Sequence, residues 1–206
     1  MTLVLASSSP RRQELLRNAG IEFIVQPADV PEARQPGESP ANFAQRLAAE
    51  KARAIWSACE TELARHSPTV RADDRRLPTG DLFVLGADTV VVVDDEVLGK
   101  PADATDAARM LRLLSGRTHQ VTTGVCLVGQ GFEDVRSETT DVSFDTLTPA
   151  DISAYVAHGE PMDKAGAYAI QGIASRWICR LEGCYFNVVG LPVPLVYRLL
   201  REHGAI

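Results

Sequence analysis

The feature that most constrains this chain is the apolar run 82–93, which is interrupted by one carboxylate, Asp88. A run so rich in Val and Leu predicts a long buried strand. A carboxylate buried there without partners would cost on the order of several kcal/mol. We therefore expect Asp88 to meet a cation, a metal or a hydrogen-bond cluster, or to lie where the strand borders a cleft. The alternative is a structural Asp that caps a neighbouring turn.

The rest of the chain alternates between patterns typical of strands and patterns typical of helices. Ser9 followed by Pro10 is a sound helix start, and Gly20 is a stop signal. The mixture predicts an α/β fold with a mixed sheet and flanking helices. The predicted strands are 3–6, 22–26, 82–93, 97–98, 120–128 and 134–144, the predicted helices are 9–18, 39–58, 105–114, 149–156 and 194–202, and 176–189 is predicted to be a hairpin that turns at Gly183.

Length and cysteine content bound the domain organisation. With 206 residues the chain fits a single domain, 1–206. Residues 59–80 show no periodicity and carry many charges, which predicts a solvated loop insertion. The four cysteines have no metal-ligand spacing, and reduced thiols are the favoured interpretation. Alternatively, Cys179 and Cys184 could face each other across a turn.

Charge and hydropathy argue against several classes of function. The net charge is −6, whereas nonspecific nucleic-acid binding depends on surplus Lys and Arg, so we expect no nucleic-acid partner. A small phosphorylated ligand needs only a few local cations and stays compatible. The N-terminus has no basic region before its short apolar run, so it does not predict a signal peptide. No apolar stretch approaches the roughly 20 residues of a membrane span, so we expect no membrane partner.

The predicted first strand leads directly into the segment Ser7-Ser8-Ser9-Pro10-Arg11-Arg12. A helix start of this kind attracts anions through unpaired backbone N–H groups and its partial positive charge. The helix dipole disfavours cations in the first turn, so Arg11 and Arg12 make sense there if a phosphate binds beside them. The alternative is an ordinary Ser N-cap followed by two solvated arginines.

Two further segments combine unusual local features. Lys51 falls at helical spacing on the same stripe as Leu47 and Ile55, which places its cation on an apolar face. Snorkelling of the Lys51 side chain to water is the favoured interpretation of that pattern alone. Residues 164–172 contain small residues and two glycines, which permit close approach to a ligand, and Gln171 could donate to and accept from a base edge. A tightly packed loop is the favoured alternative there.

Together these stretches resemble the Maf family, in family order from residue 3 to about residue 200. The resemblance implies a mixed α/β fold with a cleft between two lobes, related to the inosine triphosphate pyrophosphatases. It also implies a cytoplasmic nucleoside triphosphate pyrophosphatase that requires a divalent cation, Mg²⁺ or Mn²⁺, and forms a homodimer. The insertion at 59–80 departs from the family pattern by its length. The matching blocks are 5–16, 49–52, 86–90, 99–101, 164–172 and 189–192.

The resemblance assigns roles to residues at matching positions. Asp88 matches the catalytic proton acceptor, and Glu32 falls where an acidic cleft residue is expected, so this pair would hold the metal ion. A second group matches the polar and basic residues around the triphosphate. Its members are Ser7, Ser9, Arg12, Lys51 and Lys100.

Three positions match those that set substrate specificity in the family: Arg11, Thr89 and Gln171. This combination resembles the branch that acts on dTTP and UTP. A neutral Gln can donate to O4 or O2 and accept from N3–H of thymine or uracil. The alternatives are a pyrophosphatase for purine nucleotides or 7-methyl-GTP, and a non-enzymatic regulator of septum formation.

Overall fold

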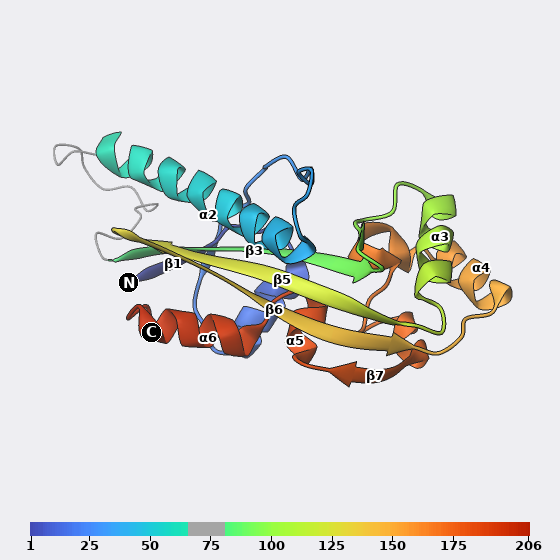
Figure 1. The fold of residues 1–206 in the computed structure, drawn as a ribbon. Helices are drawn as coiled ribbons and strands as arrows, with labels where there is room; N and C mark the ends of the chain where they lie inside the picture. Colours follow the sequence, from blue (N-terminus) through green and yellow to red (C-terminus); the bar gives the residue numbers. More distant parts are fainter. Residues whose placement is uncertain (66–80) are drawn as a thin grey trace.

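The computed structural model describes residues 1–65 and 81–206, and it shows one mixed sheet with helices on both faces (Figure 1). The strands are β1 (Thr2–Leu5), β2 (Ile24–Val25), β3 (Leu82–Val93), β4 (Glu96–Leu98), β5 (Thr118–Gly129), β6 (Phe132–Phe144) and β7 (Ile178–Glu182). The helices are α1 (Pro10–Asn18), α2 (Pro40–Arg65), α3 (Ala104–Leu114), α4 (Pro149–His158), α5 (Tyr185–Val189) and α6 (Val193–Glu202), with 3₁₀ turns η1 (Glu160–Asp163), η2 (Ala165–Ala167) and η3 (Ile173–Trp177).

Strand pairing makes the sheet mixed, as the sequence predicts. The order is β2-β1-β3-β5-β6-β7, and β4 pairs with the far end of β3. The pairs of β1 with β2 and with β3 are parallel, whereas β3, β5, β6 and β7 pair antiparallel. The three long strands β3, β5 and β6 run through the whole length of the molecule and connect its two lobes.

The two faces of the sheet bury alternate residues of β3, because side chains of a strand point to opposite faces in turn. Val84 packs in a cluster with Ala48 and Ala52 of α2. Phe83 and Leu85 pack on the other face, in a cluster that includes leucines of α1 and α6. The predicted long buried strand 82–93 is therefore confirmed, and its two faces meet different helices.

Helix α2 lies unusually close to the sheet because glycines face it. A Cβ atom built on Gly86 would lie 2.1 Å from the backbone oxygen of Ala48, and one built on Gly124 would lie 2.4 Å from that of Ala44. No other residue fits at these two positions without a shift of the helix. The close approach brings the side chain of Lys51 within reach of β3.

The second lobe forms at the other end of the long strands. Here α3 and α4 pack with η2 and η3 over the ends of β3, β5 and β6. The chain termini, α2 and α6 lie at the opposite end of the sheet (Figure 1). Two lobes joined by continuous strands leave room for a cleft where the helices of one lobe give way to those of the other.

Most predicted elements are confirmed, and two predictions are wrong. The hairpin at 176–189 does not form: β7 pairs with β6, and the chain then turns at Gly183 into α5. The apolar composition of 185–189 fits a strand equally well, but its buried Asn187 hydrogen-bonds to the sheet and selects a helical turn. Residues 59–65 belong to α2, not to a loop, because Cys59 is buried against the sheet.

The other expectations about the chain stand as follows. Residues 66–80, which carry the rest of the predicted insertion, lie outside the described residues. The four cysteines are free thiols, so Cys179 and Cys184 do not form a disulfide. Across residues 1–65 and 81–206, no helix is long and apolar enough to cross a membrane.

Candidate active site

A cleft of about 410 Å³ lies at the junction of the two lobes, and the middle of β3 forms its floor. The walls come from the β1–α1 loop, α2, the segment after β2, the segment after β4, and residues 163–171. All ten residues singled out from the sequence line this cleft. They are Ser7, Ser9, Arg11, Arg12, Glu32, Lys51, Asp88, Thr89, Lys100 and Gln171.

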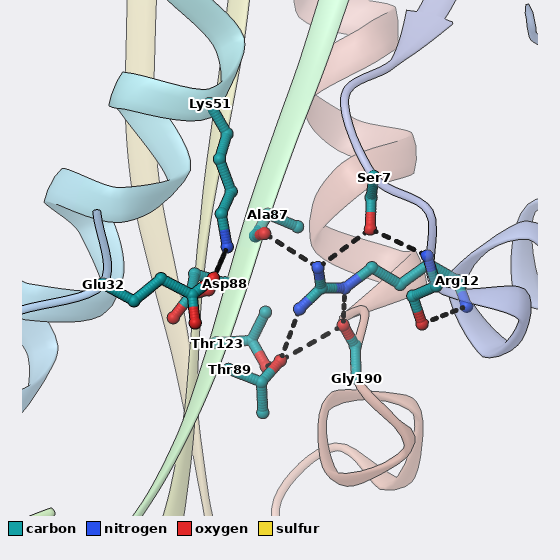
Figure 2. Close-up of polar contacts among 10 residues, drawn as sticks. Ser7, Arg12, Glu32, Lys51, Ala87, Asp88, Thr89, Thr123 and Gly190 are labelled. Carbon is teal, nitrogen blue, oxygen red and sulfur yellow. Dashed lines mark hydrogen bonds and ion pairs between the residues drawn. The ribbon is translucent and has the colours of Figure 1, made fainter. Parts of the chain in front are cut away.

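Asp88 and Thr89 are neighbours on β3, so their side chains point to opposite faces of the sheet. Figure 2 shows Lys51 and Glu32 on the Asp88 side of the strand and Arg12 on the Thr89 side. Both faces are open to the same cleft. The strand therefore presents an ionic side and a hydrogen-bonded side to a single ligand.

The ionic side is a cluster of three charges. Lys51 Nζ donates to Glu32 Oε1 at 2.6 Å and to Asp88 Oδ1 at 2.7 Å. The side chains of Lys51 and Asp88 are 10% and 11% exposed, whereas the Glu32 side chain is 53% exposed. The favoured interpretation of Lys51 from the sequence, snorkelling to water, is wrong, because its ammonium group ends on the buried carboxylate.

Burial separates the two carboxylates in their acidity. Desolvation raises the pKa of Asp88 above its ordinary value, although the charges of Lys51 and Arg12 oppose this. Desolvation also opposes the charge of Glu32, but there the hydrogen bond and charge of Lys51 prevail, and the pKa falls. Two carboxylates whose pKa values are driven apart can take different roles, and the one with the raised pKa is the better proton acceptor.

The other side of β3 is organised by Arg12, whose guanidinium group is largely consumed by protein acceptors. Its Nε donates to the Gly190 carbonyl at 2.9 Å, and its NH1 donates to the Ala87 carbonyl at 2.8 Å and to Ser7 Oγ at 3.1 Å. Its NH2 donates to Thr89 Oγ1 at 3.1 Å. Four of the five guanidinium N–H groups are thus used, which leaves one for a phosphate.

The start of α1 has the free backbone donors that the predicted anion site requires. Ser9 caps the helix by accepting from the Arg12 backbone N–H, and the Ser9 backbone N–H donates to Ser7 Oγ at 3.3 Å. Among the described residues, no acceptor pairs with the backbone N–H groups of Ser7 and Ser8. These donors line the cleft at a positive helix end, where an anion is stabilised.

The rim of the cleft carries side chains with few protein contacts. Lys100 and Gln171 are exposed, and in the described part of the chain their side chains make no hydrogen bond or ion pair. Arg11 makes one long ion pair of 3.8 Å with Asp163 across the cleft. These three groups are therefore free to turn toward a ligand.

The far wall is held close to β3 by residues 164–172. Gly166 has a positive φ of 69°, donates its N–H to the Gly99 carbonyl, and lies so near Val91 that a Cβ would be 2.9 Å from its methyl groups. Tyr168 lines the cleft, and its hydroxyl pairs with Nε2 of His119 at 2.8 Å. Burial lowers the pKa of His119 to about 4, so the imidazole behind Tyr168 is neutral at neutral pH.

Three buried polar residues behind the cleft escaped the sequence analysis. Thr123, Thr140 and Asn187 have no exposed surface. The signal that could have found Asn187 is an amide in the apolar stretch 185–189. Thr123 and Thr140 carry no such signal, since Thr is common in strands on either face.

The two carboxylates have oxygens available for a divalent cation. Glu32 and Asp88 each give one oxygen to Lys51, so each keeps a second oxygen for another ligand. The described residues hold no group of three or more His, Cys, Asp or Glu side chains able to bind a metal alone. Mg²⁺ usually takes one or two carboxylates and completes its shell with phosphate oxygens and water. The donor set fits a cation that arrives with a phosphorylated ligand.

The chain is similar to known proteins over nearly its whole length. A family model described as "Maf-like protein" matches residues 2–203. A protein of Koribacter versatilis (strain Ellin345) named "dTTP/UTP pyrophosphatase" is 52% identical over 206 residues, covering 100% of this chain and 96% of its own length. Proteins with the same name from Symbiobacterium thermophilum (strain DSM 24528 / JCM 14929 / IAM 14863 / T) and Syntrophomonas wolfei subsp. wolfei (strain DSM 2245B / Goettingen) are 50% and 45% identical, covering 98% and 97% of this chain and 94% and 96% of their own lengths.

Proposed function

Because the chain belongs to the Maf family, we propose that it is a nucleoside triphosphate pyrophosphatase that hydrolyses dTTP and UTP to the monophosphate and pyrophosphate. The observation that carries the proposal is the cleft itself. It brings together a buried carboxylate of raised pKa on β3, free backbone donors at the start of α1, and the ammonium group of Lys100, which has no partner among the described residues. Relatives 45–52% identical over nearly their whole length bear the name of that activity.

Asp88 is the proposed proton acceptor. A water molecule loses its proton to the carboxylate as its oxygen forms a bond to phosphorus, and the P–O bond between the α and β phosphates breaks to release pyrophosphate. The raised pKa of Asp88 brings its basicity closer to that needed at neutral pH. Lys51 keeps the carboxylate oriented through its 2.7 Å hydrogen bond.

The triphosphate is proposed to lie between the start of α1 and the rim cations. The free N–H groups of Ser7 and Ser8 and the ammonium group of Lys100 supply the positive charge that a leaving pyrophosphate requires. Ser9 orders this helix start, and the remaining N–H of Arg12 adds one further donor.

Asp88 and Glu32 are proposed to hold Mg²⁺ or Mn²⁺ through the oxygens that Lys51 leaves free. When bound, such a cation neutralises phosphate charge and polarises the phosphoryl group. Glu32 remains ionised well into the acidic range because Lys51 lowers its pKa against the effect of burial.

Base selection is proposed to rest on Gln171, with Arg11 and Thr89 beside it in the same cleft. The Gln171 amide is free of protein partners and can both donate and accept, which matches the edge of thymine or uracil. A base with a different hydrogen-bonding edge would cover these polar groups and leave them unpaired. Discrimination between bases by hydrogen bonding is therefore expected to be large.

The substrate assignment is tested by comparing kcat/KM for dTTP, UTP, CTP, GTP and 7-methyl-GTP at equal Mg²⁺. We expect dTTP and UTP to be preferred, and Gln171→Glu to lower that preference by about ten-fold or more, since a carboxylate cannot donate to O4. A preference of the wild-type protein for 7-methyl-GTP or GTP would contradict the assignment. Absence of turnover with every nucleotide would point to a non-enzymatic role.

Two further properties are proposed from family membership alone. The protein is proposed to act as a cytoplasmic homodimer. Light scattering across working concentrations checks the assembly, and a particle of about 22 kDa, the mass of one chain, would contradict it.

A further inference from the structure

A chain of hydrogen bonds runs from the cleft into the sheet behind it, on the Thr89 face of β3 (Figure 2). Arg12 NH2 donates to Thr89 Oγ1, which pairs with Thr123 Oγ1 of β5 at 2.9 Å. The Thr123 hydroxyl is also 3.3 Å from the Asn187 carbonyl of α5. Thr89 Oγ1 lies at the same distance, 3.3 Å, from the Gly190 carbonyl.

The inner end of this chain is fixed in direction. Asn187 Nδ2 donates to the Val121 carbonyl at 2.8 Å and to Thr140 Oγ1 at 3.0 Å. The Val121 carbonyl can only accept, so the amide cannot be reversed. Its Oδ1 is consequently left buried without a partner, and an unpaired buried oxygen costs stability. The protein keeps Asn187 in one orientation despite that cost.

At the outer end, each of the two hydroxyl groups carries one proton, and three arrangements place both protons on protein acceptors. In the first, Thr89 donates to Thr123 and Thr123 donates to the Asn187 carbonyl. In the second, Thr123 donates to Thr89 and Thr89 donates to the Gly190 carbonyl. In the third, each hydroxyl donates to its own carbonyl, Thr89 to Gly190 and Thr123 to Asn187. In all three, Thr89 accepts from Arg12.

Thr123 therefore controls how Thr89 faces the cleft without touching a ligand. Its side chain has no exposed surface and is not part of the cleft lining. The segment that it holds together includes Thr89, next to Asp88 on β3, and the Gly190 carbonyl, which receives Arg12 Nε. The buried hydroxyl thus contacts Thr89 directly, and it is linked to Gly190 through the Asn187 carbonyl, which also accepts from the Gly190 N–H at 3.0 Å.

We propose that Thr123 is a positioning residue: its hydroxyl sets Thr89, Arg12 and the Gly190 carbonyl in register with Asp88. As a statement about catalysis, this rests on the proposed pyrophosphatase activity.

The test is Thr123→Val, which removes the hydroxyl and keeps the shape of the side chain. Thr122→Val is the matched control. Thr122 directly precedes Thr123 on β5 and is also buried, with 3% of its surface exposed. Its hydroxyl pairs with Thr139 Oγ1 at 2.9 Å, and neither residue lines the cleft. Thr123→Ser keeps the hydroxyl and serves as the rescue variant.

We expect Thr123→Val to lower kcat on dTTP by about ten-fold, with KM changed by no more than about two-fold, because misplaced groups cost more in the transition state than in binding. Thr123→Ser and Thr122→Val should stay close to wild type. The acidic limb of the pH profile should not move in any of the three, since no charge changes. In Thr123→Val, backbone amides of 187–190 should exchange faster than in Thr122→Val.

Equal kcat values and equal exchange rates for Thr123→Val and Thr122→Val would overturn the proposal. So would a Thr123→Ser variant no better than Thr123→Val. If the wild-type protein hydrolyses no nucleoside triphosphate, the proposed function fails by itself, and the exchange comparison still decides whether Thr123 positions the segment.

Discussion

The two faces of β3 at the cleft pair their buried polar groups in different ways. On the Asp88 face the partners are ionic: one ammonium group lies between two carboxylates. On the Thr89 face, no carboxylate of residues 1–65 or 81–206 is in hydrogen-bonding contact with the buried guanidinium group of Arg12. Its donors end on two carbonyls and two hydroxyls. An ionic arrangement changes with protonation, whereas hydrogen bonds to neutral groups keep their geometry across pH.

The faces are nevertheless coupled through the strand. Burial lowers the pKa of Arg12 while the charge of Asp88 acts to raise it, and Arg12 in turn acts to lower the pKa of Asp88. We therefore propose different roles for the two faces. The ionic face would carry the chemistry and respond to pH, and the neutral face would hold the geometry in which that chemistry takes place.

The largest expected effect breaks the ionic face at its centre. Asp88→Asn removes the proposed proton acceptor and should lower kcat by about 10²–10⁴-fold. The melting temperature should not fall greatly, because burial already disfavours the Asp88 charge. Asp141→Asn on β6, outside the cleft lining, is the control for a lost carboxylate. Near-normal turnover of a folded Asp88→Asn variant would show that the chemistry lies elsewhere.

The next effect concerns pH dependence. Burial raises the pKa of Asp88, and the charge of Lys51 acts against this effect. Lys51→Met removes that charge, so the pKa of Asp88 should rise further. Because a proton acceptor must be ionised to act, the proposed role of Asp88 predicts that the acidic limb of kcat/KM moves to higher pH. Lys51→Arg retains the charge and should move it much less. A Lys51→Met profile with an unmoved acidic limb would mean that Asp88 does not govern it.

The smallest expected effect distinguishes adjacent arginines. Arg12→Lys loses hydrogen bonds to buried acceptors and should reduce the free energy of unfolding by about 1–3 kcal/mol. Arg11→Lys changes a half-exposed side chain with one long ion pair, and should cost at most about 1 kcal/mol. Chemical denaturation of both variants measures this. Equal losses of unfolding free energy in the two variants would contradict the inference that Arg12 stabilises the fold through its hydrogen bonds to buried acceptors.

The sequence predicted the ionic face better than the neutral one, for a physical reason. Asp88 and Lys51 stand out because charges break apolar patterns that a strand and a helix otherwise keep. Thr123 leaves no such mark, since its importance depends on which strand and helix it meets in space. The helical turn at α5 escaped prediction for the same reason, because the hydrogen bonds of Asn187 to distant strands outweigh its local preference.

The main proposal for this protein is that its cleft cleaves a nucleoside triphosphate between the α and β phosphates. Phosphorus NMR of dTTP turnover in the presence of Mg²⁺ tests it directly, with Asp88→Asn as the control for contaminating activity. We expect dTMP and pyrophosphate to appear in equal amounts with the wild-type protein, and neither to form at an appreciable rate with Asp88→Asn. Formation of dTDP and orthophosphate as the first products would contradict it.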